Sequence, residues 1–288
     1  MEKCYLCPCQ CGVDRSAYLG ACHSDDKIRI AKYMVHMWEE PPISGTRGSG
    51  CIFFSGCPLG CVYCQNKEIS RGGIGRIYSA SDLGKIMLEL QDKGVHNINL
   101  VTPTHYSDKI RQALDLIRGQ LKIPVVYNTS GYEKDEEIEK MAGYVDVFLT
   151  DLKYFSSEAS TKYSHRGDYF AVAISALEKM LEAKPRVVLD ENGIMKSGVI
   201  VRHLVLPTLR QDSIRILDEL KSRFDISAFK LSLMSQYTPE FCDPKYKELC
   251  RNLTSFEYES VLSHAINLGF DGYLQDKGAN TSKYTPKF

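Results

Sequence analysis

The most informative segment of the chain reads Gly50-Cys51-Ile52-Phe53-Phe54-Ser55-Gly56-Cys57-Pro58-Leu59-Gly60-Cys61-Val62-Tyr63-Cys64-Gln65-Asn66. Its first part, residues 51–55, is apolar or small and predicts a short buried strand. Gly56 and Pro58 end this strand, and three cysteines follow in a C-x3-C-x2-C spacing. A loop this tight brings the three sulfurs toward one point, and converging thiolates bind either zinc or an iron–sulfur cluster.

The number of cysteines in this loop bears on its chemistry. A structural zinc site uses four protein ligands, and a four-iron cluster that only carries electrons is usually held by four cysteines. No fourth thiol, His or Asp stands just beyond Cys64, where Gln65 and Asn66 follow. A cluster anchored by Cys57, Cys61 and Cys64 leaves one iron open, and an open coordination position indicates a catalytic site.

This cysteine loop resembles that of the radical S-adenosylmethionine (SAM) superfamily, in which an aromatic residue, here Tyr63, precedes the last cysteine. The resemblance implies a 4Fe–4S cluster on Cys57, Cys61 and Cys64 whose open iron binds the amino and carboxylate groups of SAM. It also implies that one electron from the cluster cleaves the sulfonium and releases a 5′-deoxyadenosyl radical.

Length and composition restrict the remaining classes. The 288 residues suffice for one large α/β domain, and 36 basic against 36 acidic residues leave no charge excess that would favour nucleic acid. The start lacks an apolar signal core, and no apolar run of about 18 residues predicts a membrane span. The 11 cysteines are odd in number and gather in the first 64 residues. This pattern predicts metal binding rather than disulfides, in a reducing, oxygen-poor cytoplasm.

A second group of thiols lies at the N-terminus. Cys4, Cys7, Cys11 and Cys22 follow a C-x2-C-x3-C-x10-C spacing, with Cys9 between them as a spare. Four thiols fit a tetrahedral zinc ion or a closed four-iron cluster, and the alternative is a set of free thiols. The spacing therefore predicts a second metal site without identifying its metal.

The chain divides into two parts in this interpretation. Residues 1–50 form a cysteine-rich metal-binding extension and linker, and residues 51–288 form the catalytic domain. Within the first part, residues 27–40 are expected to connect the extension to the domain. The pair Glu39 and Glu40 lies in this connection, and two interpretations of it stay open. Either the two carboxylates line the site, or they form a solvated pair after a buried Trp.

Beyond the cysteine loop, strand patterns alternate with helical patterns. Strands are predicted at 51–55, 98–102, 124–129, 145–150, 199–206 and 229–235. Helices are predicted at 82–93 after an N-cap at Ser81, and at 106–119, 133–142, 170–181, 213–224 and 255–268. The alternation predicts an α/β fold, a partial (β/α)6 TIM-like barrel with an N-terminal cysteine-rich extension. Right-handed crossovers place the C-terminal end of every strand on one rim, where we expect the active site.

Polar residues collect at the ends of five of these strands. They are Thr102-Pro103-Thr104-His105, Asn128-Thr129-Ser130-Gly131, Thr150-Asp151-Leu152-Lys153, Arg202-His203 and Met234-Ser235-Gln236-Tyr237. Any one of them is explained as well by a cap or an ion pair. Their repetition favours a site for the ribose hydroxyls and the carboxylate of a nucleoside-linked amino acid.

Within the superfamily, the chain resembles the pyruvate formate-lyase activating enzyme group, and particularly its activating-enzyme-like branch. Matching stretches run through nearly the whole chain and include Trp38-Glu39-Glu40-Pro41, Ile43-Ser44-Gly45, Phe53-Phe54-Ser55-Gly56-Cys57, Leu100-Val101-Thr102-Pro103-Thr104-His105, Tyr127-Asn128-Thr129-Ser130-Gly131-Tyr132, Asp151-Leu152-Lys153, Val201-Arg202-His203-Leu204-Val205-Leu206-Pro207 and Lys283-Tyr284-Thr285-Pro286.

This resemblance implies roles for individual residues. Asn128 and Ser130 would hydrogen-bond the ribose or the methionine part of SAM, and Asp151 and Lys153 would lie beside its carboxylate and sulfonium. His203 would contact SAM from the fifth strand. The resemblance also implies that the peptide around Tyr63 faces adenine and that a monovalent cation binds near Thr129 and Asp151.

The chain departs from the pattern of its relatives after the second strand. Many relatives carry Gly-Gly-Glu there to hold the amino group of SAM, whereas this chain has Thr102-Pro103-Thr104-His105. A backbone carbonyl is the remaining candidate for that contact. Cys51 is interpreted as a small buried strand residue, and Cys242 and Cys250 as ordinary buried thiols.

The resulting hypothesis is a radical SAM enzyme that abstracts a hydrogen atom from a substrate. A glycyl-radical protein, a peptide and a small molecule are all admissible as the substrate, and the electron donor is expected to be a low-potential flavodoxin or ferredoxin type of protein. Two other classes stay open: an iron–sulfur electron carrier without SAM chemistry, and a zinc-stabilised interaction module. The polar strand ends speak against the electron carrier.

Overall fold

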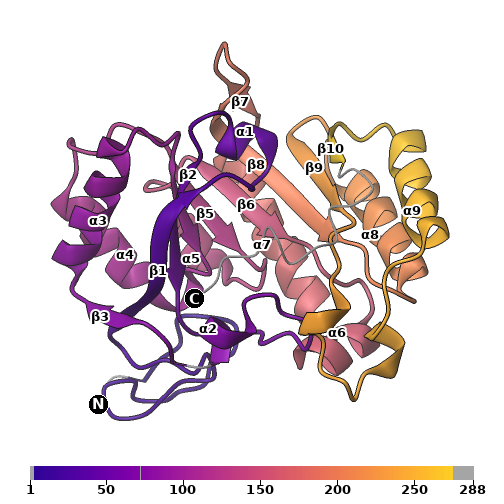
Figure 1. Cartoon of the computed structure of the whole chain (residues 1–288), viewed down its shortest axis with the longest axis horizontal. Helices are drawn as coiled ribbons and strands as arrows, with labels where there is room; N and C mark the ends of the chain where they lie inside the picture. Colours follow the sequence, from indigo (N-terminus) through magenta and orange to yellow (C-terminus); the bar gives the residue numbers. More distant parts are fainter. Residues whose placement is uncertain (1–2, 72, 275–288) are drawn as a thin grey trace.

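One mixed sheet with helices along its outer side dominates the computed structural model, which describes residues 3–71 and 73–274 (Figure 1). Six parallel strands follow the predicted positions: β2 (Ser49–Phe54), β4 (Ile98–Val101), β5 (Val125–Thr129), β6 (Val147–Asp151), β8 (Met195–Leu204) and β9 (Phe229–Met234). They lie in the order β9-β8-β6-β5-β4-β2. The predicted α/β fold is confirmed, and the sheet stays open instead of closing into a full barrel.

Four further strands extend this sheet. A parallel strand β10 (Gly272–Leu274) adds to β9, and the antiparallel strands are β1 (Ile28–His36), β3 (Arg76–Tyr78) and β7 (Val188–Leu189). The sequence predicts only a connection for residues 27–40, but β1 pairs along β2, with Met34 opposite Cys51. The pairing is stabilised because Ile28 and Ile30 bury their side chains in the core.

The six predicted helices are α3 (Ala80–Asp92), α4 (Ser107–Leu116), α5 (Asp135–Met141), α7 (Tyr169–Ala183), α8 (Arg210–Arg223) and α9 (Ser255–Asn267). The N-cap predicted at Ser81 is wrong. Ser79 caps α3, because its hydroxyl accepts a hydrogen bond from the Asp82 N–H while the Asp82 carboxylate accepts one from the Ser79 N–H. The sequence analysis missed α6 (Ser157–Ser164), whose Ser- and Thr-rich sequence carries a weak helical pattern, and the short helices α1 (Pro41–Ser44) and α2 (Lys67–Arg71).

The structure contains three buried apolar clusters, and the two larger ones bear on where a cavity can form. The larger one lies between the sheet and the helices and takes side chains from nearly every element. The smaller one lies on the inner face of the sheet, where Ile43 of α1 packs against Val126, Val147, Leu149 and Ile200. These side chains fill the half of the inner face toward the start of the strands, and a cavity lies toward the C-terminal ends of the strands.

The N-terminal segment, residues 3–27, contains no helix or strand along its length. It lies below the C-terminal ends of the strands, near α2, while α1 and the β7 hairpin lie at the opposite end of the molecule (Figure 1). None of the helices formed by residues 3–71 and 73–274 combines the length and the apolar composition needed to cross a bilayer.

Candidate active site

The cysteine loop starts where β2 ends, and backbone hydrogen bonds hold it from two sides. Gly56 turns the chain with φ +92°, in the left-handed region. The Cys57 N–H donates to the carbonyl of Cys22 at 3.0 Å, and the Val62 N–H donates to the carbonyl of Tyr163 at 2.9 Å. The loop is therefore placed by the N-terminal segment on one side and by α6 on the other.

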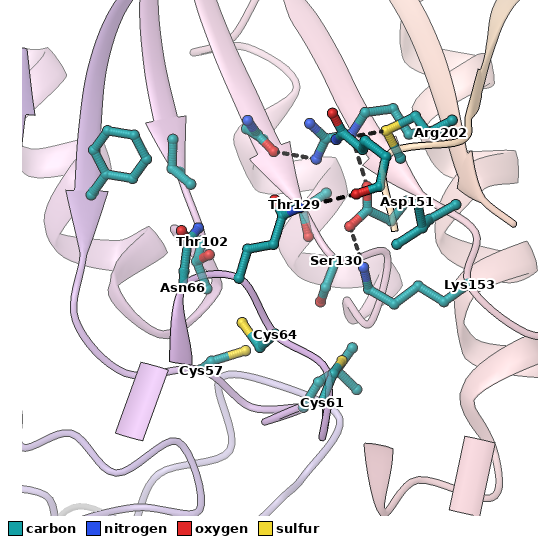
Figure 2. Close-up of a pocket in the computed structure, with 18 of the residues that line it drawn as sticks. Cys57, Cys61, Cys64, Asn66, Thr102, Thr129, Ser130, Asp151, Lys153 and Arg202 are labelled. Atoms are coloured by element: carbon teal, nitrogen blue, oxygen red, sulfur yellow. Dashed lines mark hydrogen bonds and ion pairs between the residues drawn. The ribbon is translucent and has the colours of Figure 1, made fainter. Parts of the chain in front are cut away.

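The three thiols face one cavity of about 250 Å³ at the C-terminal ends of the strands (Figure 2). The residues that line it come from the cysteine loop, from the end of β1 and the segment after it, and from the ends of strands β2, β4, β5, β6, β8 and β9. They include Cys57, Cys61, Cys64, Tyr63, Asn66, Thr102, Asn128, Thr129, Ser130, Asp151, Lys153, Arg202 and Met234. All of the residues proposed from the sequence for the cluster and for SAM therefore border this cavity except His203.

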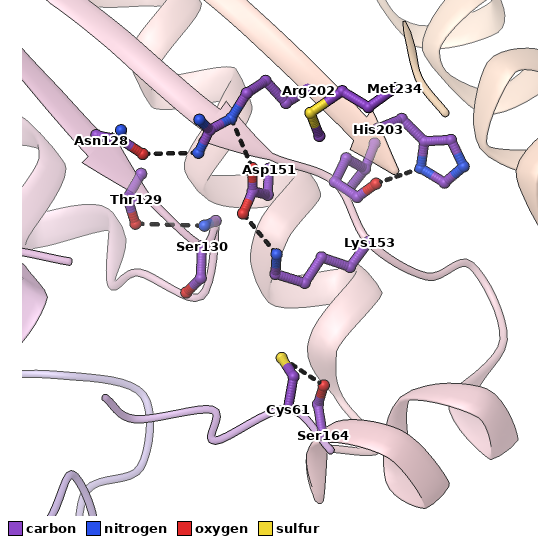
Figure 3. Close-up of polar contacts among 12 residues, drawn as sticks. Cys61, Asn128, Thr129, Ser130, Asp151, Lys153, Ser164, Arg202, His203 and Met234 are labelled. Atoms are coloured by element: carbon purple, nitrogen blue, oxygen red, sulfur yellow. Dashed lines mark hydrogen bonds and ion pairs between the residues drawn. The ribbon is translucent and has the colours of Figure 1, made fainter. Parts of the chain in front are cut away.

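A charged network forms the wall opposite the cysteines (Figure 3). Arg202 donates from Nε to Asp151 Oδ1 at 2.8 Å and from Nη2 to Asn128 Oδ1 at 2.6 Å, and Lys153 Nζ donates to Asp151 Oδ2 at 2.5 Å. Burial disfavours the charged form of Asp151, but the charges of Arg202 and Lys153 outweigh it and lower the pKa of the carboxyl. Asp151 is thus an anion held between two cations at the cavity wall.

A buried hydroxyl between the network and the cysteines suits a bound polar group. The Ser130 Oγ is buried and has no hydrogen-bond partner among the described residues. Buried polar groups in folded proteins are rarely left without a partner, so an unpaired hydroxyl at a cavity wall suits a ligand. The Ser130 side chain lies between the Asp151 network and Cys61 (Figure 3).

The thiols themselves suit a cationic metal cluster. Burial, and next the neighbouring Cys61 thiol, raise the pKa of Cys57 to about 12 and that of Cys64 to about 11. Three adjacent thiolates are therefore stable here only beside positive charge, which a metal centre supplies. The Ser164 hydroxyl lies 3.0 Å from Cys61 Sγ and adds a hydrogen bond to this sulfur. Nowhere in residues 3–71 and 73–274 do three His, Cys, Asp or Glu side chains enclose the position of a single metal ion.

Tyr63 is held rigidly beside the cavity. Its hydroxyl accepts a hydrogen bond from the Tyr154 hydroxyl at 2.7 Å, and its ring packs edge-on against Tyr237 with centroids 6.1 Å apart. These contacts fix the backbone between Cys61 and Cys64, which is the part of the loop that the resemblance assigns to adenine.

His203 does not line the cavity, which corrects the expectation that it contacts SAM. Its Nδ1 lies 2.6 Å from the carbonyl of Leu152 and its Nε2 lies 2.8 Å from Ser213 Oγ. Successive side chains of a strand point to opposite faces, so His203 points toward α8 while Arg202 and Leu204 point into the cavity. The sequence analysis placed Arg202 among the polar strand ends but gave it no separate role, and the alternation of side chains along β8 is the signal that favours it over His203.

Of the two interpretations of Glu39 and Glu40, the structure supports the one in which a carboxylate lines the site. Glu39 borders the cavity, and its Oε2 lies 3.6 Å from Arg202 Nη1. Burial raises the pKa of Glu39 against the opposing effect of Arg202. Trp38, for which the alternative requires burial, is 61% exposed. Cys51 is fully buried as expected, and its thiol also donates to Glu39 Oε1 at 3.6 Å.

A second buried carboxyl lies behind the cavity wall and was not identified from the sequence. Glu133 is 1% exposed and accepts hydrogen bonds from the hydroxyls of Thr104 and Thr129. Burial raises its pKa to about 7.

Thr102, which lines the cavity, has φ +59°, a left-handed conformation that is uncommon for a non-glycine residue. Backbone strain therefore occurs at the position where relatives are expected to carry glycine.

The other cysteines take different environments. Cys7 and Cys22 are buried and Cys4, Cys9 and Cys11 are partly buried, all in the N-terminal segment. Cys242 is buried as expected, but Cys250 is exposed, which corrects the prediction of two buried thiols. The short turn of Lys247–Leu249 directs Leu249 into the core, so the next residue faces outward.

Comparisons with known proteins agree with this geometry. Residues 51–220, more than half of the chain, match the family model described as the radical SAM superfamily. An uncharacterized protein of Methanocaldococcus jannaschii is 29% identical over 280 residues, which cover 94% of this chain and 76% of that protein.

Two solved structures show a similar fold. A radical SAM methyltransferase from Sphaerobacter thermophilus has a TM-score of 0.57 at 13% identity, covering 80% of this chain and 67% of that chain. SuiB of Streptococcus suis, in a structure bound to S-adenosylmethionine, has a TM-score of 0.50 at 16% identity, covering 81% of this chain and 51% of that chain. This chain thus spans about half the length of SuiB, and at these identities the likeness concerns the fold.

Proposed function

Because this chain belongs to the radical SAM superfamily, we propose that Cys57, Cys61 and Cys64 hold a 4Fe–4S cluster and that the cavity above them binds SAM. When bound, the cluster and SAM supply a 5′-deoxyadenosyl radical, which abstracts a hydrogen atom from a substrate. The observation that carries the proposal is one cavity bordered by three thiols and, opposite them, by Ser130, Asp151, Lys153 and Arg202. An electron carrier has no need of such a polar cavity.

The residues of the cavity wall have separate tasks in this proposal. Arg202 holds Asn128 and Asp151 in fixed positions through two hydrogen bonds, so both oxygens are oriented before a ligand arrives. Asp151 keeps a negative charge that suits the ammonium or sulfonium of SAM, and Lys153 offers a cation for its carboxylate. Ser130 offers an unpaired hydroxyl to the same ligand. The cavity walls keep most water away from these charges, which strengthens each contact.

The substrate and the electron donor follow from the resemblance to activating enzymes. We propose an oxidoreductase of the pyruvate formate-lyase activating type, whose substrate is a glycyl-radical protein or a small molecule. A low-potential flavodoxin or ferredoxin type of protein in the cytoplasm would supply the electron. Spin resonance on a mixture with a candidate glycyl-radical protein, and deuterium transfer from a labelled small molecule into 5′-deoxyadenosine, distinguish the two kinds of substrate.

The test of the reaction type is reductive cleavage of SAM. The protein is reconstituted with iron and sulfide without oxygen, given SAM and dithionite, and assayed for 5′-deoxyadenosine and methionine. We expect both products from the wild type and from Cys250→Ser, because Cys250 is exposed and does not line the cavity. Cys57→Ala should form neither. If the wild type forms no more nucleoside than Cys57→Ala, the proposed reaction is wrong.

A further inference from the structure

The N-terminal segment, residues 3–27, is ordered around thiols rather than around hydrocarbon. Its large apolar side chains Tyr5, Tyr18 and Leu19 are exposed, whereas Cys7 and Cys22 are buried. A segment of this length without helix, strand or apolar core cannot gain enough from hydrophobic burial to hold one conformation, and metals or disulfides commonly supply the missing stability.

The four thiols of the predicted site share one neighbourhood. A Cβ atom added at Gly20 would lie 3.4 Å from Cys22 Sγ and 3.6 Å from Cys11 Sγ, so these two sulfurs flank the same point. The Arg15 guanidinium lies 3.9 Å from Cys4 Sγ. The thiol of Cys22 interacts electrostatically with Cys4 and with Cys7 as well as with Arg15.

A loop closed by backbone hydrogen bonds and a shorter turn present these thiols. In the first, the Cys4 N–H donates to the carbonyl of Val13 at 2.9 Å and the Gly12 N–H donates to the carbonyl of Cys4 at 3.0 Å. In the second, the Gly20 N–H donates to the carbonyl of Ser24 at 3.0 Å, with Cys22 between them. Such turns bring sulfurs that are distant in sequence to one side of the backbone.

Cys9 forms a side-chain hydrogen bond with Cys7 and also reaches toward the catalytic loop. Its sulfur lies 3.1 Å from Arg166 Nη2 and 3.6 Å from the carbonyl of Pro58, so it faces the catalytic loop. Arg166 Nη2 also donates to the carbonyl of Pro58 at 2.9 Å. The spare thiol of the sequence analysis therefore links Cys7 to the catalytic loop.

We propose that Cys4, Cys7, Cys11 and Cys22 hold a second, closed metal centre, distinct from the catalytic cluster and independent of the proposed reaction. The centre is one four-iron cluster, because four thiolates satisfy it, whereas no three side chains among residues 3–71 and 73–274 enclose the position of a single ion such as zinc. The four thiols release their protons to solvent as the metal binds. Having four protein ligands, this centre has no open position for SAM.

The proposed centre lies against the catalytic loop. The carbonyl of Cys22 accepts the Cys57 N–H at 3.0 Å, and the Ser24 hydroxyl donates to the carbonyl of Ser55 at 3.1 Å. Arg15 Nη1 donates to the carbonyl of His105 at 2.7 Å, and the His105 ring in turn contacts the carbonyl of Ser55. The segment that carries the second centre therefore supports the first cysteine of the catalytic loop.

The test is metal content in a chain that cannot hold the catalytic cluster. The full chain carrying Cys57→Ala, Cys61→Ala and Cys64→Ala is purified without oxygen, and zinc, iron and acid-labile sulfide are measured by mass spectrometry and colorimetry. We expect four iron with four sulfide for each chain. This result supports the site, whereas a chain that holds zinc alone or no metal overturns it.

Two further variants assign the ligands. Adding Cys11→Ser to the triple variant should remove the remaining centre, and adding Cys9→Ser should leave it in place. If the Cys11→Ser chain does not fold, X-ray absorption on the triple variant still decides the matter. Four sulfur neighbours of the metal support the proposal, and nitrogen or oxygen neighbours overturn it. Because the triple variant cannot cleave SAM, failure of the second centre and failure of the proposed reaction are separate results.

Discussion

Two cysteine-rich regions lie side by side in this protein, and they differ in what their thiols face. The catalytic loop carries three cysteines that border a polar cavity, and the N-terminal segment carries five, of which Cys7 and Cys22 are buried. The first region begins at the end of a strand in a sheet, whereas the second has neither strand nor helix. The position of a cysteine group in the fold, as well as its number of thiols, therefore distinguishes the catalytic loop from the N-terminal segment.

The largest effect that we expect is on SAM affinity, and it tests the charged groups at the wall of the catalytic cavity. Asp151→Asn removes the anion between Arg202 and Lys153, and breaking a buried ion pair typically costs about 3–5 kcal/mol. We expect SAM to bind about 100-fold more weakly, which corresponds to about 3 kcal/mol. Calorimetry on the reconstituted protein measures the affinity, and the iron–sulfur absorbance should be unchanged. The control is Asp190→Asn, which loses an ion pair with Lys196 far from the cavity. Equal affinity in both variants would remove Asp151 from the site.

The next effect concerns the wall of the same cavity and depends on pH. Burial raises the pKa of Glu133 from its ordinary value of 4.5 to about 7, so the folded protein binds this proton more tightly than the unfolded chain. The free energy of unfolding should therefore fall by about 3 kcal/mol as the pH rises from 4.5 to 7, with little change from this group above pH 7.

Denaturation at pH 5 and pH 8 measures this fall. Glu133→Gln has no proton to lose and should abolish the contribution, while still accepting hydrogen bonds from Thr104 and Thr129 through its amide oxygen. The exposed Glu136→Gln serves as the control and should behave as the wild type. The same pH dependence in wild type and Glu133→Gln would show that another group is responsible.

A smaller effect tests whether the two cysteine regions need their direct contact. A Cβ atom at Gly56 would clash with the Ser24 hydroxyl and lie 2.7 Å from the carbonyl of Cys22, and Gly56 also has a positive φ. Gly94 has a positive φ of 81° but no neighbour within 4 Å of an added Cβ. Gly94→Ala should cost about 1 kcal/mol for its conformation alone, and Gly56→Ala about 2 kcal/mol more for the clash. Equal destabilisation by denaturation would mean that the contact between the regions is loose.

The smallest effect that we expect tests whether Cys9 belongs to the metal ligands of the N-terminal segment. Cys9 contacts Arg166 and Pro58 as well as Cys7. Cys9→Ser keeps a polar group there, so the free energy of unfolding should change by no more than about 0.5 kcal/mol. Metal content and denaturation of the otherwise wild-type chain measure this. A loss of metal would place Cys9 among the ligands.

The sequence alone was sufficient for features that depend on local pattern. The three-cysteine spacing after an apolar strand identified the superfamily. The alternation of strand and helix patterns placed all six parallel strands and the six predicted helices, because the spacing of apolar residues is a property of neighbouring residues. The cavity-lining positions of Asn128, Ser130, Asp151 and Lys153 also followed, since parallel strands bring their C-terminal ends to one rim.

Only the tertiary structure decided features that depend on which face a side chain takes and what packs against it. Arg202 rather than His203 enters the cavity, because the pleat of β8 assigns neighbours to opposite faces. Glu39 reaches Arg202 only because β1 pairs with β2 and brings the following residues over the inner face of the sheet. The thiols of Cys11 and Cys22 meet at Gly20 through turns whose hydrogen bonds join residues far apart along the chain. Local sequence carries no record of such contacts, since they are set by packing.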